Sequence, residues 1–131
     1  MVLNVGPQPR TLSGISLWGV RRNLAQYRGT VVTVSCAMDD GESERFAREI
    51  MALLRSAGWV INQDLVKQEA RVPIPTGVLV ESPGPEGEAL VELGLCLWDL
   101  GFQVEGRDET SAELPNVHVG VKPRPGAPRY P

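Results

Sequence analysis

One layout of residues occurs twice along the chain, in residues 30–63 and again in residues 76–105. Each copy begins with a β-branched apolar run, passes through an acidic polar turn into an amphipathic stretch, and resumes extended structure after a glycine and an aromatic residue. The short apolar runs predict strands, and apolar residues recurring three or four positions apart predict helices. Two strand-helix-strand halves in tandem predict a ferredoxin-like βαββαβ fold, an α+β two-layer sandwich with both helices on one face of the sheet.

Two further elements flank this repeat. Residues 11–28 carry apolar side chains at helical spacing and are followed by Gly29, so we expect an extra N-terminal helix. Residues 116–121 alternate in polarity, which predicts a C-terminal edge strand. These patterns do not decide the strand order. The alternative is therefore a three-layer α/β fold with a mostly parallel sheet, in which the N-terminal helix covers the opposite face.

The length of 131 residues fits one domain, which we place at residues 11–122. Residues 1–10 contain Pro7 and Pro9 and few apolar side chains, so we expect a flexible arm there. Residues 123–131 are rich in proline, which predicts an extended polyproline-like tail.

Charge and composition exclude several classes of partner. A formal net charge of −3 argues against nucleic-acid binding, because neutralising phosphates requires a clustered basic face. No apolar run approaches the roughly 20 residues needed to cross a bilayer, so we expect no membrane span. The N-terminus lacks the layout of a secretory signal, and the two cysteines have no recognisable spacing. We therefore expect a cytoplasmic protein, and the preference for arginine over lysine suggests a bacterial source.

Five polar residues are candidates for binding a small ligand. Asp39 and Asp40 follow the first strand of the repeat, Glu81 ends the corresponding strand of its second half, and Ser82 is expected to cap the helix that follows. Ligands of open α/β sheets bind at the carboxyl ends of strands, which favours these four. His118, the single histidine, lies in the last strand and has a pKa suited to acid-base chemistry. Helix capping explains the aspartates without a ligand, and a half-exposed strand position explains the histidine.

None of these residues has the spacing of a catalytic or metal-binding motif, so we expect no catalytic residue, no metal and no cofactor. Cys36 ends a strand just before a predicted helix, where a thiolate would be favoured. Acidic neighbours oppose that charge, and a buried core cysteine is the preferred interpretation. Trp18, Trp59 and Trp98 are expected to anchor helices to the sheet, and any of them left exposed would mark a partner surface.

The chain resembles an uncharacterised bacterial α/β module that usually follows transmembrane helices in small membrane-anchored proteins. The residues that carry this resemblance are Gly29 to Val32, Glu42, Glu44, Phe46, Ala47, Leu53, Leu54, Ala57 to Trp59, Gly77, Val78, Val119, Gly120, Lys122 and Pro123. The resemblance implies a cytoplasmic sensory or interaction domain, and it carries no catalytic residues across.

We expect a non-enzymatic module that binds a partner protein or a second copy of itself, with the N-terminal helix and the proline-rich tail as contact surfaces. The alternative is a sensor of a small ligand, a nucleotide or a metabolite, that uses the exit of the first strand and the turn from Ser82 to Gly87. A hydrolase or transferase that uses Cys36 or His118 is the third hypothesis.

Overall fold

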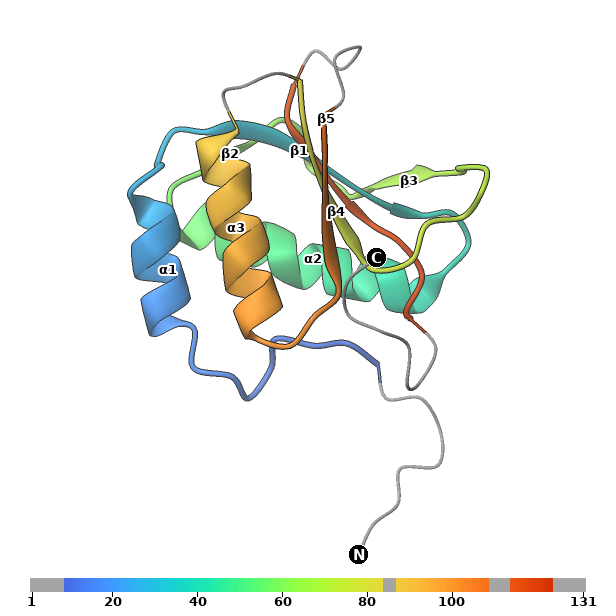
Figure 1. The fold of residues 1–131 in the computed structure, drawn as a ribbon, viewed down its shortest axis with the longest axis horizontal. Coiled ribbons are helices and arrows are strands. Elements are labelled where there is room, and N and C mark those ends of the chain that lie inside the picture. Colours follow the sequence, from blue (N-terminus) through green and yellow to red (C-terminus); the bar gives the residue numbers. More distant parts are fainter. Residues whose placement is uncertain (1–8, 84–86, 109–113, 124–131) are drawn as a thin grey trace, which may run out of the picture.

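The computed structural model describes residues 9–83, 87–108 and 114–123, which form three helices and a six-stranded mixed sheet (Figure 1). The elements, in chain order, are α1 (Trp18–Ala25), β1 (Val31–Ala37), α2 (Gly41–Ser56), β2 (Val60–Ile61), β3 (Lys67–Glu69), β4 (Val78–Ser82), α3 (Glu88–Asp99), β5 (Val104–Asp108) and β6 (Asn116–Val119). None of the described helices is long and apolar enough to cross a membrane.

The strand order is β2-β1-β6-β4-β5. β2 pairs with the start of β1, and β3 pairs with the end of β1, at residues 35–37. β2, β3 and β6 are all parallel to β1, whereas β4 is antiparallel to β6 and parallel to β5. The two halves of the repeat are therefore β1-α2-β2 and β4-α3-β5, which run in opposite directions on either side of β6. Each half keeps its own two strands adjacent.

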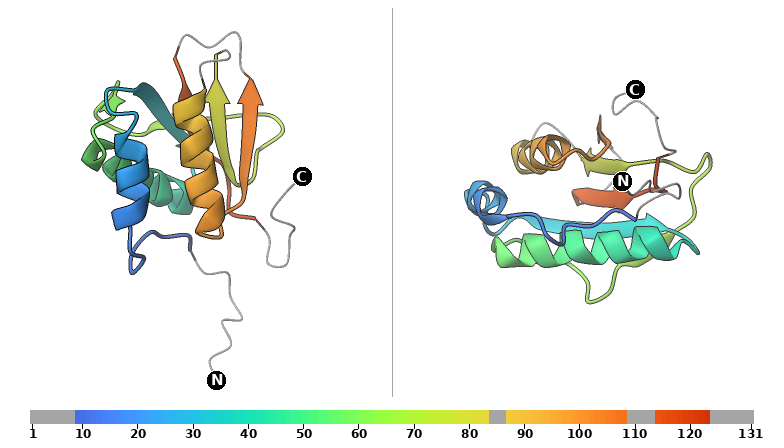
Figure 2. Two further views of the ribbon diagram at one scale, coloured as in Figure 1. Left: turned by 60° about the vertical axis from the view of Figure 1, so that its left-hand side comes forward. Right: turned by 90° about the horizontal axis from the view of Figure 1, so that it is seen from below.

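This arrangement corrects part of the expected architecture. The ferredoxin-like strand order is not confirmed, and the mostly parallel sheet fits the alternative. The strand expected at the edge is central, because both neighbours of β6 bond to it and Val117 and Val119 point into the core. The N-terminal helix α1 packs against α2 and α3 on their side of the sheet, so it does not cover the opposite face (Figure 2).

Glycine ends the helices where the sequence predicts. Gly29, Gly58 and Gly101 have positive φ angles and follow α1, α2 and α3. Two helices begin later than expected. The turn before α1 keeps residues 11–17 out of the helix, and Ser82 is the last residue of β4 rather than a helix cap. The sequence does not predict β3, because Lys67 to Glu69 are polar throughout and lack a strand pattern.

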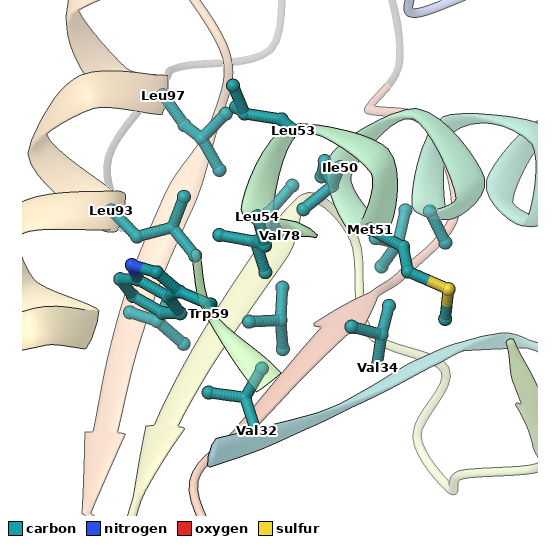
Figure 3. Close-up of a cluster of buried hydrophobic side chains, with 14 of the residues drawn as sticks. Val32, Val34, Ile50, Met51, Leu53, Leu54, Trp59, Val78, Leu93 and Leu97 are labelled. Atoms are coloured by element: carbon teal, nitrogen blue, oxygen red, sulfur yellow. The ribbon is translucent and has the colours of Figure 1, made fainter. Parts of the chain in front are cut away.

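One continuous core lies between the helices and one face of the sheet (Figure 3). Leu53 and Leu54 from α2 and Leu93 and Leu97 from α3 converge on this face (Figure 3). The sheet contributes Val32, Val34, Cys36, Val78, Val80, Val117 and Val119. Of the three tryptophans, Trp59 is buried in the core, and its indole N–H donates a hydrogen bond of 2.8 Å to the Leu24 carbonyl.

The face of the sheet opposite the helices, called the outer face here, carries the alternate side chains of the same strands. These are Ser35, Leu79, Glu81, Asn116 and His118. Residues 70–77 connect β3, which pairs with β1, to β4 on the other side of β6 (Figure 1). We call these residues the crossover segment. Val121 ties the end of this segment, because its N–H donates to the Pro75 carbonyl at 2.9 Å and its carbonyl accepts from Gly77 at 3.0 Å.

Candidate functional site

The structure separates the five predicted ligand residues into three places. Glu81 and His118 meet in one buried polar network on the outer face. Ser82 points to the other face and lines a cavity beside α3. Asp39 and Asp40 lie beyond the carboxyl end of β1, before α2.

The outer-face network connects three strands and the crossover segment. The Ser35 hydroxyl lies 2.8 Å from Nδ1 of His118, and the Asn116 amide donates to Ser35 Oγ at 3.1 Å and to Glu81 Oε1 at 2.9 Å. The Arg71 guanidinium binds both oxygens of Glu81 at 2.7 Å, a bidentate geometry. Arg71 also donates to Glu69. The Arg71 and Glu81 pair therefore ties the crossover segment to the centre of the sheet.

Burial controls the protonation of this network. Ser35, Glu81 and His118 are all buried. Burial lowers the pKa of His118, and the nearby Arg71 charge lowers it further, so the imidazole is neutral at pH 7. Burial alone would raise the pKa of Glu81, but hydrogen bonds from Arg71 and Asn116 hold it below the usual value. The carboxylate therefore remains charged and paired.

His118 is hydrogen-bonded through one ring nitrogen. Its Nδ1 pairs with the Ser35 hydroxyl, which also accepts from the Asn116 amide. Nε2 is buried and has no hydrogen-bond partner among the described residues. The pair resembles a serine activated by a base, but Ser35 is buried, so its hydroxyl is not accessible to a substrate in this structure. The network as it stands binds segments of the chain to one another.

A cavity of about 470 Å³ lies beside α3, at the carboxyl ends of β4 and β5. Ser82 and Gly106 belong to its strand side. Its apolar lining comes from Tyr27, Val80, Leu90, Val91 and Leu95. Three carboxylates line it as well, those of Glu88, Glu92 and Asp108. Its one guanidinium, from Arg107, is already paired with Glu105. The cavity is therefore lined by apolar and acidic side chains.

Large apolar side chains remain exposed on the helices next to this cavity. Trp18 on α1 is 68 % exposed, and Val91 and Leu95 on α3 are 59 % and 55 % exposed. Arg22 covers the Trp18 ring at 5.4 Å. α1 and α3 lie side by side (Figures 1 and 2), and the exposed residues of these two helices are called the α1–α3 surface.

The acidic turn after β1 has partners of its own. Asp40 occupies the position before α2, and its carboxylate accepts a hydrogen bond from Ser43. Asp39 adopts a positive φ of 60°, and its N–H donates to Gln68 at 3.1 Å. In the described ranges, no three His, Cys, Asp or Glu side chains gather in a way that could hold a metal ion.

Arg10 binds beside this turn and fixes the start of the described chain. Its guanidinium and its backbone N–H all donate to Glu42, at 2.7 to 3.0 Å, and the guanidinium also reaches the Gly120 carbonyl at 2.7 Å. Of the expected flexible arm, residues 1–8 lie outside the described residues. The proline-rich tail lies there too, apart from Pro123.

Both cysteines are buried, as the core interpretation predicts. Burial raises the pKa of the Cys36 thiol, and the acidic neighbours Glu44 and Asp40 raise it further. Burial also raises the pKa of Cys96, to about 11. Neither thiol has the lowered pKa that a nucleophile at pH 7 requires.

Three members of the outer-face network were not predicted from the sequence: Ser35, Arg71 and Asn116. Asn116 precedes His118 by two positions in one strand, so alternation alone places both side chains on one face. Ser35 and Arg71 carry no comparable signal, because only the pairing of β1 with β6 and the path of the crossover segment bring them close. No family model, curated protein or solved structure matches this chain.

Proposed function

We propose that this protein is a self-association module whose α1–α3 surface binds a second copy of the chain. The observation that carries the proposal is the group of large apolar side chains left exposed on two adjacent helices, Trp18, Val91 and Leu95. Val91 and Leu95 lie one turn apart on α3, and neighbouring exposed apolar side chains are typical of an interaction surface. Free buried thiols suit a reducing compartment, and we place the module in a bacterial cytoplasm.

The energetics favour burying this patch. Fully burying a side chain such as leucine or valine contributes roughly 1.5–3 kcal/mol, and tryptophan is enriched among residues that dominate binding energy. A standard interface covers about 800 Å² per partner. The structure exposes 7864 Å², so such an interface would take about a tenth of it.

Light scattering tests the proposal. The wild-type mass should rise toward that of a dimer between about 1 µM and about 1 mM, which corresponds to binding free energies of −8.2 to −4.1 kcal/mol. Leu95→Glu should weaken association by about tenfold or more, because it puts a charge into the apolar patch. Leu65→Glu is the matched control, since Leu65 is 78 % exposed and lies in the segment between β2 and β3. A mass that stays monomeric throughout, or equal effects of both variants, would overturn the proposal.

A small-ligand sensor is the second candidate function. It is favoured by the cavity beside α3, because the predicted ligand residue Ser82 lines it and its volume lies in the usual range for ligand pockets, roughly 300–1,000 Å³. A thermal-shift panel of nucleotides and amines tests it. A ligand at a hundred times its Kd should add about 2.7 kcal/mol of stability, and Val91→Trp, which places a larger side chain at the exposed wall of the cavity, should reduce that gain.

A further inference from the structure

We propose that two copies of this chain associate edge to edge, by pairing their β5 strands antiparallel with Gly106 of one copy opposite Gly106 of the other. This inference rests on the proposed self-association and adds the contact and the register that produce it. It commits to a second copy of the chain as the occupant of the edge, because the open backbone groups and the charges of β5 are complementary to themselves.

β5 forms an open edge of the sheet (Figure 2). Among the described residues, this five-residue strand pairs with β4 alone, and its last three residues, Gly106 to Asp108, are exposed. The opposite edge is made of β2 and β3, which have two and three residues. An edge strand presents a row of unpaired N–H and C=O groups, which is a template for pairing with another strand. β5 is therefore the longest edge strand open to a second chain.

The bonds between β5 and β4 show which backbone groups face the open edge. The Gln103 carbonyl accepts a hydrogen bond of 2.9 Å from the Val78 N–H, and Val78 is in register with Val104. Successive residues of a strand direct their N–H and C=O groups to alternate sides, so the odd-numbered residues of β5 bond to β4. The groups that point to the open edge therefore belong to Val104, Gly106 and Asp108.

The position of Gly106 sets the register of the pairing. In an antiparallel ladder, two directly opposed residues exchange both of their N–H···O bonds, and such pairs alternate with pairs that exchange none. Gly106 lies in the middle of the three residues whose groups point outward. When it faces Gly106 of the second copy, Val104 of each copy faces Asp108 of the other. All outward-pointing groups of β5 are then paired.

The charges of β5 favour the same register. Glu105 and Arg107 flank Gly106, and with Gly106 at the centre Glu105 of each copy lies opposite Arg107 of the other. These are the pairs without backbone bonds, in which side chains lie closest. The next registers that keep the outward groups opposed place Glu105 opposite Glu105, or Arg107 opposite Arg107. Opposite charges across strands stabilise a sheet and like charges destabilise it, so the sequence of β5 selects the proposed register.

The exposed apolar residues of α3 lie beside this edge. Val91 and Leu95 line the same cavity as Gly106, Arg107 and Asp108 of β5. Antiparallel pairing of two identical strands creates a two-fold axis perpendicular to the sheet, so both copies keep their helices on one face. α3 of each copy then lies near the axis, on the same face as α3 of the other. Edge pairing therefore brings part of the α1–α3 surface into a closed, isologous dimer, the commonest symmetric assembly.

Charge reversal with complementation tests the pairing. Glu105→Arg and Arg107→Glu each put like charges opposite one another in both cross-strand contacts, so each variant alone should dimerise about tenfold more weakly than wild type. An equimolar mixture should recover affinity to within about threefold of wild type, because the mixed dimer restores opposite charges in both contacts. Arg48→Glu is the matched control. It breaks the exposed ion pair with Glu44 on α2 and should leave dimerisation unchanged.

Cysteine cross-linking tests the register. In the proposed dimer the two Cα atoms at position 106 lie roughly 5.5 Å apart, which is within the range for a disulfide. Gly106→Cys should therefore form a covalent dimer on mild oxidation. Asp108→Cys is the control, because each copy of position 108 faces Val104 and lies about 13 Å along the strand from the other. The two natural cysteines are buried.

The outcomes separate the two proposals. Far-ultraviolet circular dichroism first checks that each variant is folded. Recovery in the mixture together with cross-linking at position 106 and not at 108 supports the full inference. If the wild-type protein dimerises but the mixture shows no recovery, or position 108 cross-links as readily as position 106, the β5 pairing is overturned while self-association stands. If the wild-type protein remains monomeric, self-association itself fails.

Discussion

The Ser35 hydroxyl lies 2.8 Å from Nδ1 of His118, although 83 positions separate the two residues in the chain. They face each other because β1 and β6 pair in parallel with Ser35 opposite His118. Both side chains are buried on the outer face, which no described helix covers. This contact and the Asn116, Glu81 and Arg71 contacts connected to it therefore link β1, β6, β4 and the crossover segment through hydrogen bonds on this face.

Ser35→Ala should reduce the free energy of unfolding by about 1–3 kcal/mol. The substitution leaves Nδ1 of His118 buried without its hydrogen-bond partner and removes an acceptor of the Asn116 amide. Urea denaturation followed by fluorescence measures the loss. Ser13→Ala is the matched control, because Ser13 is exposed and its stability effect should stay within about 0.5 kcal/mol. Equal effects at both positions would show that the buried contact is not stabilising.

The stability should also fall as the pH decreases from 7 toward 5.5. The folded-state pKa of His118 is lowered by burial, so the unfolded chain, with a pKa near 6.5, takes up a proton that the folded chain does not. Stability therefore rises with pH through this window, with a slope of at most about 1.4 kcal/mol per pH unit.

The matched variant for this prediction is His118→Gln, which keeps a hydrogen-bonding side chain at the position and does not titrate. Its unfolding free energy should change much less over the same window. Carboxylates titrate mainly below pH 5.5, so they affect both proteins alike. Parallel pH profiles for the two proteins would exclude His118 as the source of the slope.

Arg71→Ala should destabilise the protein by roughly 2–4 kcal/mol, since it leaves the buried Glu81 carboxylate without its bidentate partner. The double variant Arg71→Met with Glu81→Leu should lose less, because it removes both charges together. Arg107→Ala breaks the more exposed ion pair with Glu105 and should cost about 0–1 kcal/mol. If Arg71→Ala proves as mild as Arg107→Ala, the crossover segment is not held by this ion pair.

The residue pattern predicts the parts of the fold that local periodicity controls. The stripe of α2 and the stop at Gly58 follow from a 3.6-residue period and a glycine with positive φ. The alternation around His118 likewise predicts which face each side chain of β6 occupies. Local periodicity does not predict the strand order, because Val117 and Val119 would be apolar both in a central strand and in an edge strand with one buried face.

The candidate site likewise combines residues that the sequence predicts with residues that only the tertiary structure brings together. Glu81 and His118 stand out in the sequence as polar residues, but their partners depend on tertiary structure. Ser35 joins them only through the β1 and β6 register, and Arg71 only through the path of residues 70–77. Exposure of Trp18 is another tertiary property, since a tryptophan at helical spacing looks the same whether it packs on the sheet or faces solvent.

Alanine substitutions at two glycines test how closely the crossover segment approaches the end of β6. A Cβ at Gly120 would lie 2.3 Å from the Pro75 carbonyl oxygen and 3.0 Å from the Gly77 oxygen, and both of these atoms belong to the backbone. Gly120→Ala should therefore reduce stability by about 1–3 kcal/mol or more, because the crossover segment must move away. Gly19→Ala is the control, since Gly19 lies in α1 with nothing within 4 Å of its Cβ position and should gain about 0.5–1 kcal/mol. Chemical denaturation of both variants gives the comparison, and a tolerated Gly120→Ala would mean that the contact between Pro75 and Gly120 is loose in solution.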